Sequence, residues 1–111
     1  MRGDALRVSD MLEAIERIRA FVSGGRAAFF ADPKTREAVT LQVLKLGEAA
    51  NGISPAFRRS HDRVPWRRLV DLRNEIVHEY FRIDLDDLWE FVIKDLDGLE
   101  RGLRHLVIRG D

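Results

Sequence analysis

The residues best suited to chemistry lie together between Arg73 and Tyr80, in the stretch Arg-Asn-Glu-Ile-Val-His-Glu-Tyr. An imidazole such as that of His78 exchanges protons near neutral pH, and a guanidinium such as that of Arg73 holds a phosphate or the charge that develops on it. These groups fall within about two turns of an expected helix. We therefore expect any catalytic centre of this chain to lie in this stretch.

The spacing of these residues limits how they can meet. Asn74 and His78 are four residues apart and share one face of a helix. Arg73 and His78 are five residues apart, about 140° around an ideal helix, which suits a single pocket poorly. They come together if two copies of the helix meet about a two-fold axis, or if the helix ends near His78.

Each of these residues also has a structural alternative. His78 can serve as a charge near the C-terminal end of a helix, which is favourable by about 0.3–1 kcal/mol. Arg73 can form an ion pair with Asp71, Glu75 or the acidic last helix. Tyr80 can be a core aromatic whose hydroxyl is hydrogen-bonded at the edge. Spacing alone favours these structural roles over catalysis.

Neither a metal ion nor a cofactor is expected. Glu75 and His78 form half of the carboxylate–histidine pattern of di-iron bundles, but neither His61 nor His105 has a glutamate three residues before it. The acidic run 84–87 lacks the glycine and spaced acceptors of a calcium loop, and no glycine-rich phosphate loop occurs. We expect His61 and His105 to be exposed.

The composition is that of a globular protein with one domain, residues 1–111. Hydrophobic residues make up 45% of the chain and charged residues 34%. No apolar stretch approaches the roughly 20 residues of a membrane span, and the N-terminal segment lacks the residue order of a signal peptide. The chain has no cysteine. We therefore expect a cytoplasmic protein that does not contact a membrane.

Charge is balanced overall but unevenly distributed. The net charge of zero argues against a protein that coats nucleic acid by bulk electrostatics. A basic segment, 58–73, precedes an acidic one, 84–100. These can be helix faces that attract each other, within one subunit or between two. Alternatively, a few arginines form a local phosphate-binding surface, with Arg63, Arg67 and Arg68 as weak candidates for RNA contact.

Apolar spacing and helix-start residues predict helices throughout, with no convincing alternation of period two. The first predicted helix runs from Ser9, or one turn earlier, to Gly24-Gly25, and a short apolar turn follows over 27–31. The next helix runs from Asp32-Pro33 to about Asn51, and a brief helix runs from Ser54-Pro55 through Phe57. Val64-Pro65 opens another long helix, and Asp84 caps the last one.

This pattern predicts an all-α, up-and-down bundle of four to five helices with short connections. Tyr80 falls on the apolar stripe that the helix after Pro65 should bury. A set of large apolar residues lies off the main stripes and could pack against a second copy: Leu41, Leu44, Phe91 and Ile93. We therefore expect a homodimer.

Three motifs, in order, resemble those of one protein family. Arg73 to Tyr80 resembles the signature of the HEPN superfamily, in which an arginine, a polar residue and three further residues precede His-x-Tyr. The stretch Leu-Lys-Leu-Gly-Glu-Ala-Ala-Asn, 44–51, resembles the Gly-Glu-containing helix of HepT-type HEPN toxins. The stretch Val-Pro-Trp-Arg-Arg-Leu-Val-Asp-Leu-Arg-Asn, 64–74, resembles their Pro-Trp segment. The resemblance covers nearly the whole chain, with Glu79 at a position that varies in the family.

The resemblance implies a homodimeric HEPN bundle with a composite cleft at the two-fold axis that cleaves RNA without a metal ion. It assigns proton exchange with the ribose 2′-hydroxyl or the leaving oxygen to His78. It assigns orientation of the scissile phosphate and charge stabilisation to Arg73, and a hydrogen bond to His78 or the phosphate to Asn74. The expected product carries a 2′,3′-cyclic phosphate.

The resemblance also implies a partner and a regulatory modification. HepT-like toxins are paired with a minimal nucleotidyltransferase antitoxin, which in some members adenylylates the tyrosine of the motif, here Tyr80. An adenylate two residues from His78 would exclude RNA by volume and by charge.

Two hypotheses follow from the sequence. The first is a toxin that acts as an endoribonuclease. The second is a non-catalytic helical module that binds a minimal nucleotidyltransferase or a nucleotide. The intact Arg73, His78 and Tyr80 favour the first, whereas the neutral net charge favours the second. The sequence identifies neither the RNA nor the bases at which it is cut.

Overall fold

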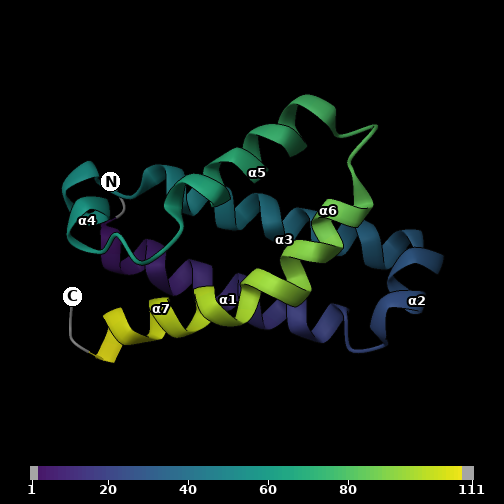
Figure 1. Ribbon diagram of the computed structural model, residues 1–111, viewed down its shortest axis with the longest axis horizontal. Coiled ribbons are helices and arrows are strands. Elements are labelled where there is room, and N and C mark those ends of the chain that lie inside the picture. Colours follow the sequence, from purple (N-terminus) through teal and green to yellow (C-terminus); the bar gives the residue numbers. More distant parts are fainter. Residues whose placement is uncertain (1–2, 109–111) are drawn as a thin grey trace.

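The computed structural model describes residues 3–108, and in this part of the chain every regular element is a helix (Figure 1). Four longer helices form the bundle: α1 (Asp4–Phe21), α3 (Pro33–Gly52), α5 (Trp66–Glu79) and α7 (Leu96–Ile108). Shorter helices join them: α2 (Gly25–Ala31), α4 (Pro55–Ser60) and α6 (Leu85–Glu90). Successive long helices run in alternating directions, which confirms the predicted all-α, up-and-down fold.

Helix α3 is the centre of the bundle. It packs along α1 on one side and along α5 on the other, while α7 lies beside α1. The apolar residues at helical spacing on these elements form one connected core. The largest of its completely buried side chains are Phe29, Phe91, Met11, Ile15, Ile18, Leu46 and Leu103.

Side-chain caps begin three of the helices, where the sequence predicted them. Asp32 accepts a hydrogen bond from the Lys34 amide (3.1 Å) ahead of Pro33. The Ser54 hydroxyl accepts one from the Phe57 amide (3.2 Å). The corresponding cap of α6 is Asp84, which accepts a hydrogen bond from the amide of residue 87 (3.1 Å). Each acceptor satisfies an amide that has no partner inside its helix.

Three boundaries differ from the prediction. Helix α1 begins at Asp4, more than a turn before Ser9, and Ser9 lies inside it. The Asp4 carboxylate accepts hydrogen bonds from the Ser54 amide (2.9 Å) and hydroxyl (2.8 Å), so a contact distant in sequence stabilises this start. The apolar turn 27–31 belongs to helix α2, and α4 continues to Ser60.

The last predicted helix is interrupted by a π-helical turn, Phe91–Asp95, between α6 and α7. In a π turn the backbone hydrogen bonds span five residues instead of the four of an α-helix, so each turn contains more residues. The extra residue rotates α6 relative to α7. Phe91 is thereby completely buried, and its predicted place on a dimer surface is wrong. Leu41 and Ile93 are exposed, as predicted, whereas Leu44 is half-buried against the core.

No helix within residues 3–108 is both long enough and apolar enough to cross a membrane.

Candidate functional site

The site is built where α3 and α5 approach each other most closely. A Cβ atom at Gly47 of α3 would lie 2.2 Å from the Cβ of Arg73 and 2.7 Å from the carbonyl oxygen of Leu69. Only a glycine lets the two helix backbones come this near. The close packing presents the next residue of α3, Glu48, to the side of α5.

Arg73 is held by two side chains at this seam. Its Nε lies 2.6 Å from Oε1 of Glu48, and its Nη1 donates to Oδ1 of Asn74 at 2.8 Å. The Arg73 side chain keeps 29% of its surface exposed, so the guanidinium is fixed in direction but open to a ligand. An ion pair between Arg73 and Asp71, Glu75 or the last helix was the alternative predicted from sequence. The observed partner lies instead on α3.

His78 and Tyr80 lie at the exposed end of α5. His78 occupies the last turn and is exposed, and it makes no hydrogen bond or ion pair within residues 3–108. Tyr80 is 63% exposed, and its ring stacks on that of Phe81, which is 88% exposed. The predicted burial of Tyr80 on the apolar stripe is therefore wrong, because α5 ends at Glu79 and the chain turns away from the core.

Asn74 and Glu75 have different environments. Asn74 bonds to Arg73 rather than to His78, four residues further along. Glu75 is half-buried against α6. Burial raises the pKa of the Glu75 carboxyl, and the nearby carboxylates of Asp87 and Asp84 raise it further.

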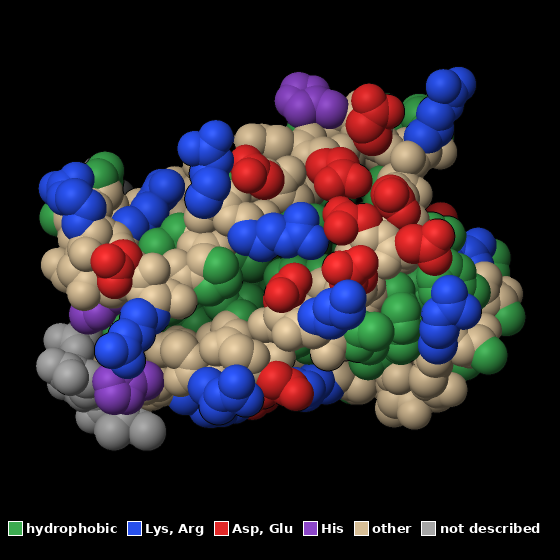
Figure 2. Space-filling model, in the orientation of Figure 1, with side chains coloured by type: hydrophobic (Ala, Val, Ile, Leu, Met, Phe, Trp, Pro, Cys, Tyr) green, Lys and Arg blue, Asp and Glu red, His purple; other side chains and the backbone are tan. Residues whose placement is uncertain are grey.

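The candidate RNA-contacting arginines are spread over the surface. Arg67 is exposed and pairs with Asp71 one turn away (3.1 Å). Arg68 lies between α5 and α6, where it pairs with Asp87 (3.2 Å) and Asp95 (4.0 Å). The two Arg68 pairs join the basic and acidic segments within one subunit. Figure 2 shows the acidic side chains gathered over α6 and the basic ones more numerous towards α4.

Arg63 lies apart from the Arg73 seam, in a hollow of about 460 Å³ at the end of α7. His61 and His105 line the same hollow. His105 is exposed, as predicted, but His61 is half-buried with its ring centroid 4.4 Å from that of Phe57.

Within residues 3–108, no group of three or more His, Asp or Glu side chains is placed to hold a metal ion.

The arrangement on α5 is suited to acid–base chemistry on an anionic substrate. Arg73 offers a directed cation, and His78 offers an imidazole that is free to exchange protons. Their separation of five residues places the two side chains on different sides of α5. One copy of the chain therefore presents the two groups in different directions.

The sequence analysis quoted Gly47 and Glu48 as part of a motif but assigned them no role in the site. Their role depends on how α3 packs on α5, which no local pattern reveals. A charged residue directly after a glycine was the available indication.

Comparison with known proteins gives a consistent result. A family model described as ribonuclease HepT-like matches residues 11–106. A Thermococcus cleftensis protein named "Probable ribonuclease HepT" is 35% identical over 94 residues, which are 84% of this chain and 86% of the relative. "Putative RNase MJ1380" of Methanocaldococcus jannaschii is 31% identical over 93 residues, 83% of this chain and 85% of the relative. No solved structure matches the chain significantly.

Proposed function

Because the chain belongs to the HepT-like ribonuclease family, we propose that it is an endoribonuclease that acts as the toxin of a toxin–antitoxin pair in the cytoplasm. The family and the names of its relatives support a ribonuclease of the HEPN type. The observation that carries the proposal is the placement of the motif on α5. Arg73 is oriented by Glu48 and Asn74, and His78 stands exposed five residues further on.

In the proposed reaction, the ribose 2′-oxygen attacks the neighbouring phosphorus, and the bond from phosphorus to the 5′-oxygen breaks. His78 accepts the 2′-hydroxyl proton or, in its protonated form, delivers a proton to the leaving 5′-oxygen. Arg73 binds the non-bridging oxygens and stabilises the charge that grows on them. The products are a 2′,3′-cyclic phosphate and a 5′-hydroxyl. The substrate supplies its own nucleophile, so the proposed reaction needs no metal ion.

A homodimer would complete this site. Arg73 of one subunit and His78 of another meet if two copies of α5 are related by a two-fold axis. The end of α5 carries the apolar surface for such a contact, since Val77, Tyr80 and Phe81 are all exposed. Leu41 and Ile93 offer further exposed apolar area.

We further propose that a minimal nucleotidyltransferase antitoxin neutralises this site by adenylylating Tyr80. The Tyr80 hydroxyl makes no hydrogen bond within residues 3–108, and the side chain is accessible. Tyr80→Phe should keep RNA cleavage but escape neutralisation. Intact-mass measurement after incubation with the partner and ATP should show one added adenylyl group on the wild type only. Modification of the Tyr80→Phe variant would place the acceptor elsewhere.

Cleavage of end-labelled RNA in excess chelator tests the ribonuclease itself. We compare the wild type, expressed without its partner, with Arg73→Ala, His78→Ala and a control, His105→Ala, which removes an exposed histidine from α7. The proposal expects cyclic phosphate ends from the wild type and the control only. Folded wild type that never cuts RNA would favour the non-catalytic module. Cutting by His78→Ala would show that the assigned residue is wrong.

A further inference from the structure

The hollow that contains Arg63 lies between the turn after α4 and the C-terminal half of α7, and we call it the α7 hollow. Its volume is about 460 Å³, within the range of ligand sites. None of the described residues that line it takes part in the proposed reaction. Any ligand of the α7 hollow therefore has a site of its own, separate from the motif on α5.

Two guanidinium groups reach the α7 hollow from different elements. Arg63 lies on the turn before α5, and Arg101 lies on α7. Both side chains are exposed, and neither makes a hydrogen bond or an ion pair within residues 3–108. By contrast, Arg104, about one turn further along α7, pairs with Glu100 at 2.9 Å. The donors of Arg63 and Arg101 are thus available to a ligand.

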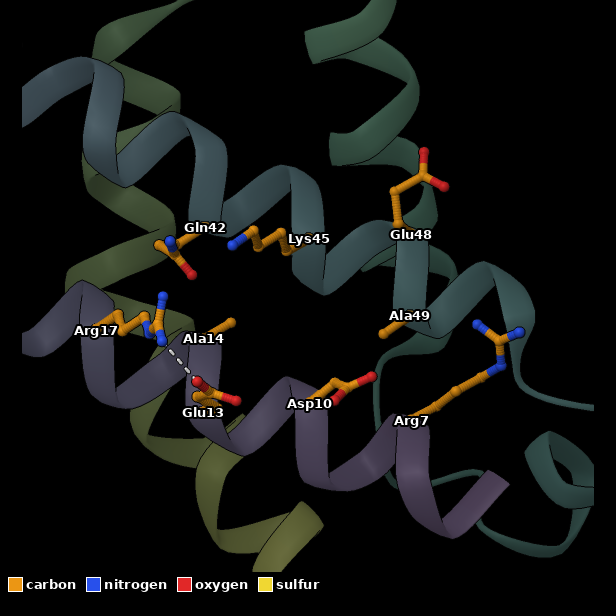
Figure 3. A pocket seen from close by; sticks show the side chains of 9 residues that line it. All are labelled: Arg7, Asp10, Glu13, Ala14, Arg17, Gln42, Lys45, Glu48 and Ala49. Carbon is orange, nitrogen blue, oxygen red and sulfur yellow. Dashed lines mark hydrogen bonds and ion pairs between the residues drawn. The ribbon is translucent and has the colours of Figure 1, made fainter. Parts of the chain in front are cut away.

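The charges that line the α7 hollow are not balanced. Asp62 is the only carboxylate among the described residues that line it, against two guanidinium groups. The groove between α1 and α3 shows the contrast (Figure 3). Its lining contains as many carboxylates as cations, namely Asp10, Glu13 and Glu48 against Arg7, Arg17 and Lys45. An anion is therefore attracted to the α7 hollow rather than to this groove.

The turn that carries Arg63 is held in place before any ligand binds. The carbonyl oxygen of His61 accepts hydrogen bonds from the indole of Trp66 (2.9 Å) and from the amide of Val64 (3.3 Å). The imidazole of His61 packs on Phe57, makes no hydrogen bond within residues 3–108, and has neither nitrogen closed to solvent. A turn fixed in this way loses less entropy when a ligand binds.

We propose that the α7 hollow binds a phosphate group, with Arg63 and Arg101 on its oxygens and a ring nitrogen of His61 as a further donor. The planar fork of a guanidinium matches the geometry of two phosphate oxygens, so two such forks suit a tetrahedral anion. The phosphate belongs either to a free phosphate compound or to an RNA strand, since both present the same oxygens. The site does not depend on the proposed ribonuclease activity.

Nuclear magnetic resonance of the imidazole protons tests the site directly. The chain contains three histidines, so the signals of His61, His78 and His105 are assigned by single substitutions. Sodium phosphate is titrated at constant pH and compared with sodium chloride at the same ionic strength. Phosphate should shift the signals of His61 and His105, which both line the hollow, by more than chloride does. The signal of His78 reports separately on the motif of α5.

Variants of the hollow test which side chains hold the phosphate. Arg63→Gln and Arg101→Gln should each raise the Kd for phosphate about three- to tenfold, because each removes one charged donor. Asp62→Asn should lower the Kd, because it removes the opposing charge. The matched control is Arg59→Gln, which removes an exposed arginine of α4 that has no partner within residues 3–108 and does not line the hollow. Its Kd should equal that of the wild type.

An RNA octamer with 2′-O-methyl groups identifies the source of the phosphate, because the methyl groups prevent cleavage. Fluorescence anisotropy measures its binding to the same variants. Weaker binding by Arg63→Gln and Arg101→Gln, but not by Arg59→Gln, would assign the hollow to a strand. Unchanged octamer binding together with a raised Kd for phosphate would assign it to a free phosphate compound.

Three outcomes would overturn the phosphate site. The first is a shift of His61 and His105 no larger with phosphate than with chloride. The second is an unchanged Kd in both Arg63→Gln and Arg101→Gln while their unfolding curves match that of the wild type. The third is an equal loss of affinity in Arg59→Gln, which would show diffuse attraction to a basic surface. A wild type that binds phosphate here but never cuts RNA would refute the ribonuclease and leave the α7 hollow as a phosphate site.

Discussion

Arg73 combines two properties that oppose each other in a phosphate-binding residue. Its ion pair with Glu48 and hydrogen bond to Asn74 fix the direction of the guanidinium, which reduces the entropy lost when a substrate binds. The same carboxylate offsets part of the positive charge that would attract RNA. Glu48 should therefore act on the orientation of Arg73 more than on the affinity for RNA.

Glu48→Gln tests whether Glu48 acts on the orientation of Arg73 rather than on the affinity for RNA. The variant keeps the shape of the side chain but removes its charge, so Arg73 is held less firmly while its own charge is less neutralised. We expect turnover to fall about tenfold, because misplaced catalytic groups are costly, with a KM for RNA that stays the same or decreases. Steady-state cleavage kinetics separate the two quantities.

The control for Glu48→Gln is Glu90→Gln, which removes an exposed carboxylate paired with Lys94 on the same turn of helix. It should behave as the wild type. Turnover of Glu48→Gln equal to that of the wild type would mean that Arg73 needs no support from α3. A raised KM with unchanged turnover would instead place Glu48 in substrate binding.

Glu75 should give the fold a distinct pH dependence. Burial first, and then the carboxylates of Asp87 and Asp84, raise the pKa of Glu75 above its ordinary value. When the pKa of a carboxyl is higher in the folded than in the unfolded protein, its contribution to stability is fully present below the pKa of the unfolded state. That contribution is lost as the pH rises through the pKa of the folded state. Glu75→Gln should therefore increase the free energy of unfolding at pH 7 and leave it nearly unchanged at pH 3. Urea unfolding at both values measures this, and a variant less stable than wild type at pH 7 would contradict it.

At the scale of elements, the distance between α3 and α5 determines the site. Gly47 allows the approach, and a methyl group there would meet the Cβ of Arg73 and the carbonyl of Leu69. Gly47→Ala should therefore push the helices apart, destabilise the fold by about 1–3 kcal/mol and reduce cleavage by more than stability alone explains. Thermal unfolding and cleavage by the folded fraction measure the two effects.

Gly98→Ala is the matched control, since the nearest atom to its added methyl group would be Nη2 of Arg101 at 3.8 Å. In the interior of a helix this exchange should leave stability unchanged or raise it by about 0.5–1 kcal/mol. Equal behaviour of the two variants would show that the α3–α5 seam tolerates a side chain at Gly47.

The accuracy of the sequence predictions depended on the range of the interaction involved. The caps at Asp32, Ser54 and Asp84 were predictable because each acceptor acts on an amide two or three residues away. The start of α1 was not, because Asp4 is held by a residue fifty positions later. The partner of Arg73 was missed for the same reason, since Glu48 lies 25 positions earlier, on another helix.

At the scale of the whole molecule, the motif faces outward. The bundle measures 40 × 27 × 23 Å, and the end of α5 lies at its edge (Figure 1). Tyr80 and Phe81, which follow this helix, are both exposed. Aromatic side chains this exposed are typical of a surface that another protein covers. A two-fold contact here would bury them and bring Arg73 of each subunit towards His78 of the other.

Complementation between inactive subunits tests this arrangement. A heterodimer of one Arg73→Ala subunit and one His78→Ala subunit contains one intact site if the site is shared, because the intact Arg73 and the intact His78 come from different chains. Heterodimers purified through two different tags should therefore recover about half of the wild-type cleavage rate per dimer, since one of two sites works.

The reciprocal heterodimer makes the result decisive. A wild-type subunit paired with an Arg73→Ala/His78→Ala subunit keeps both groups on one chain. A shared site predicts that this dimer is inactive, because each cleft then lacks either the arginine or the histidine. A site contained in one subunit predicts the opposite pattern, with half the activity in the reciprocal heterodimer and none in the first. That opposite pattern would require α5 to bring Arg73 and His78 together within one chain, against their separation of five helical residues.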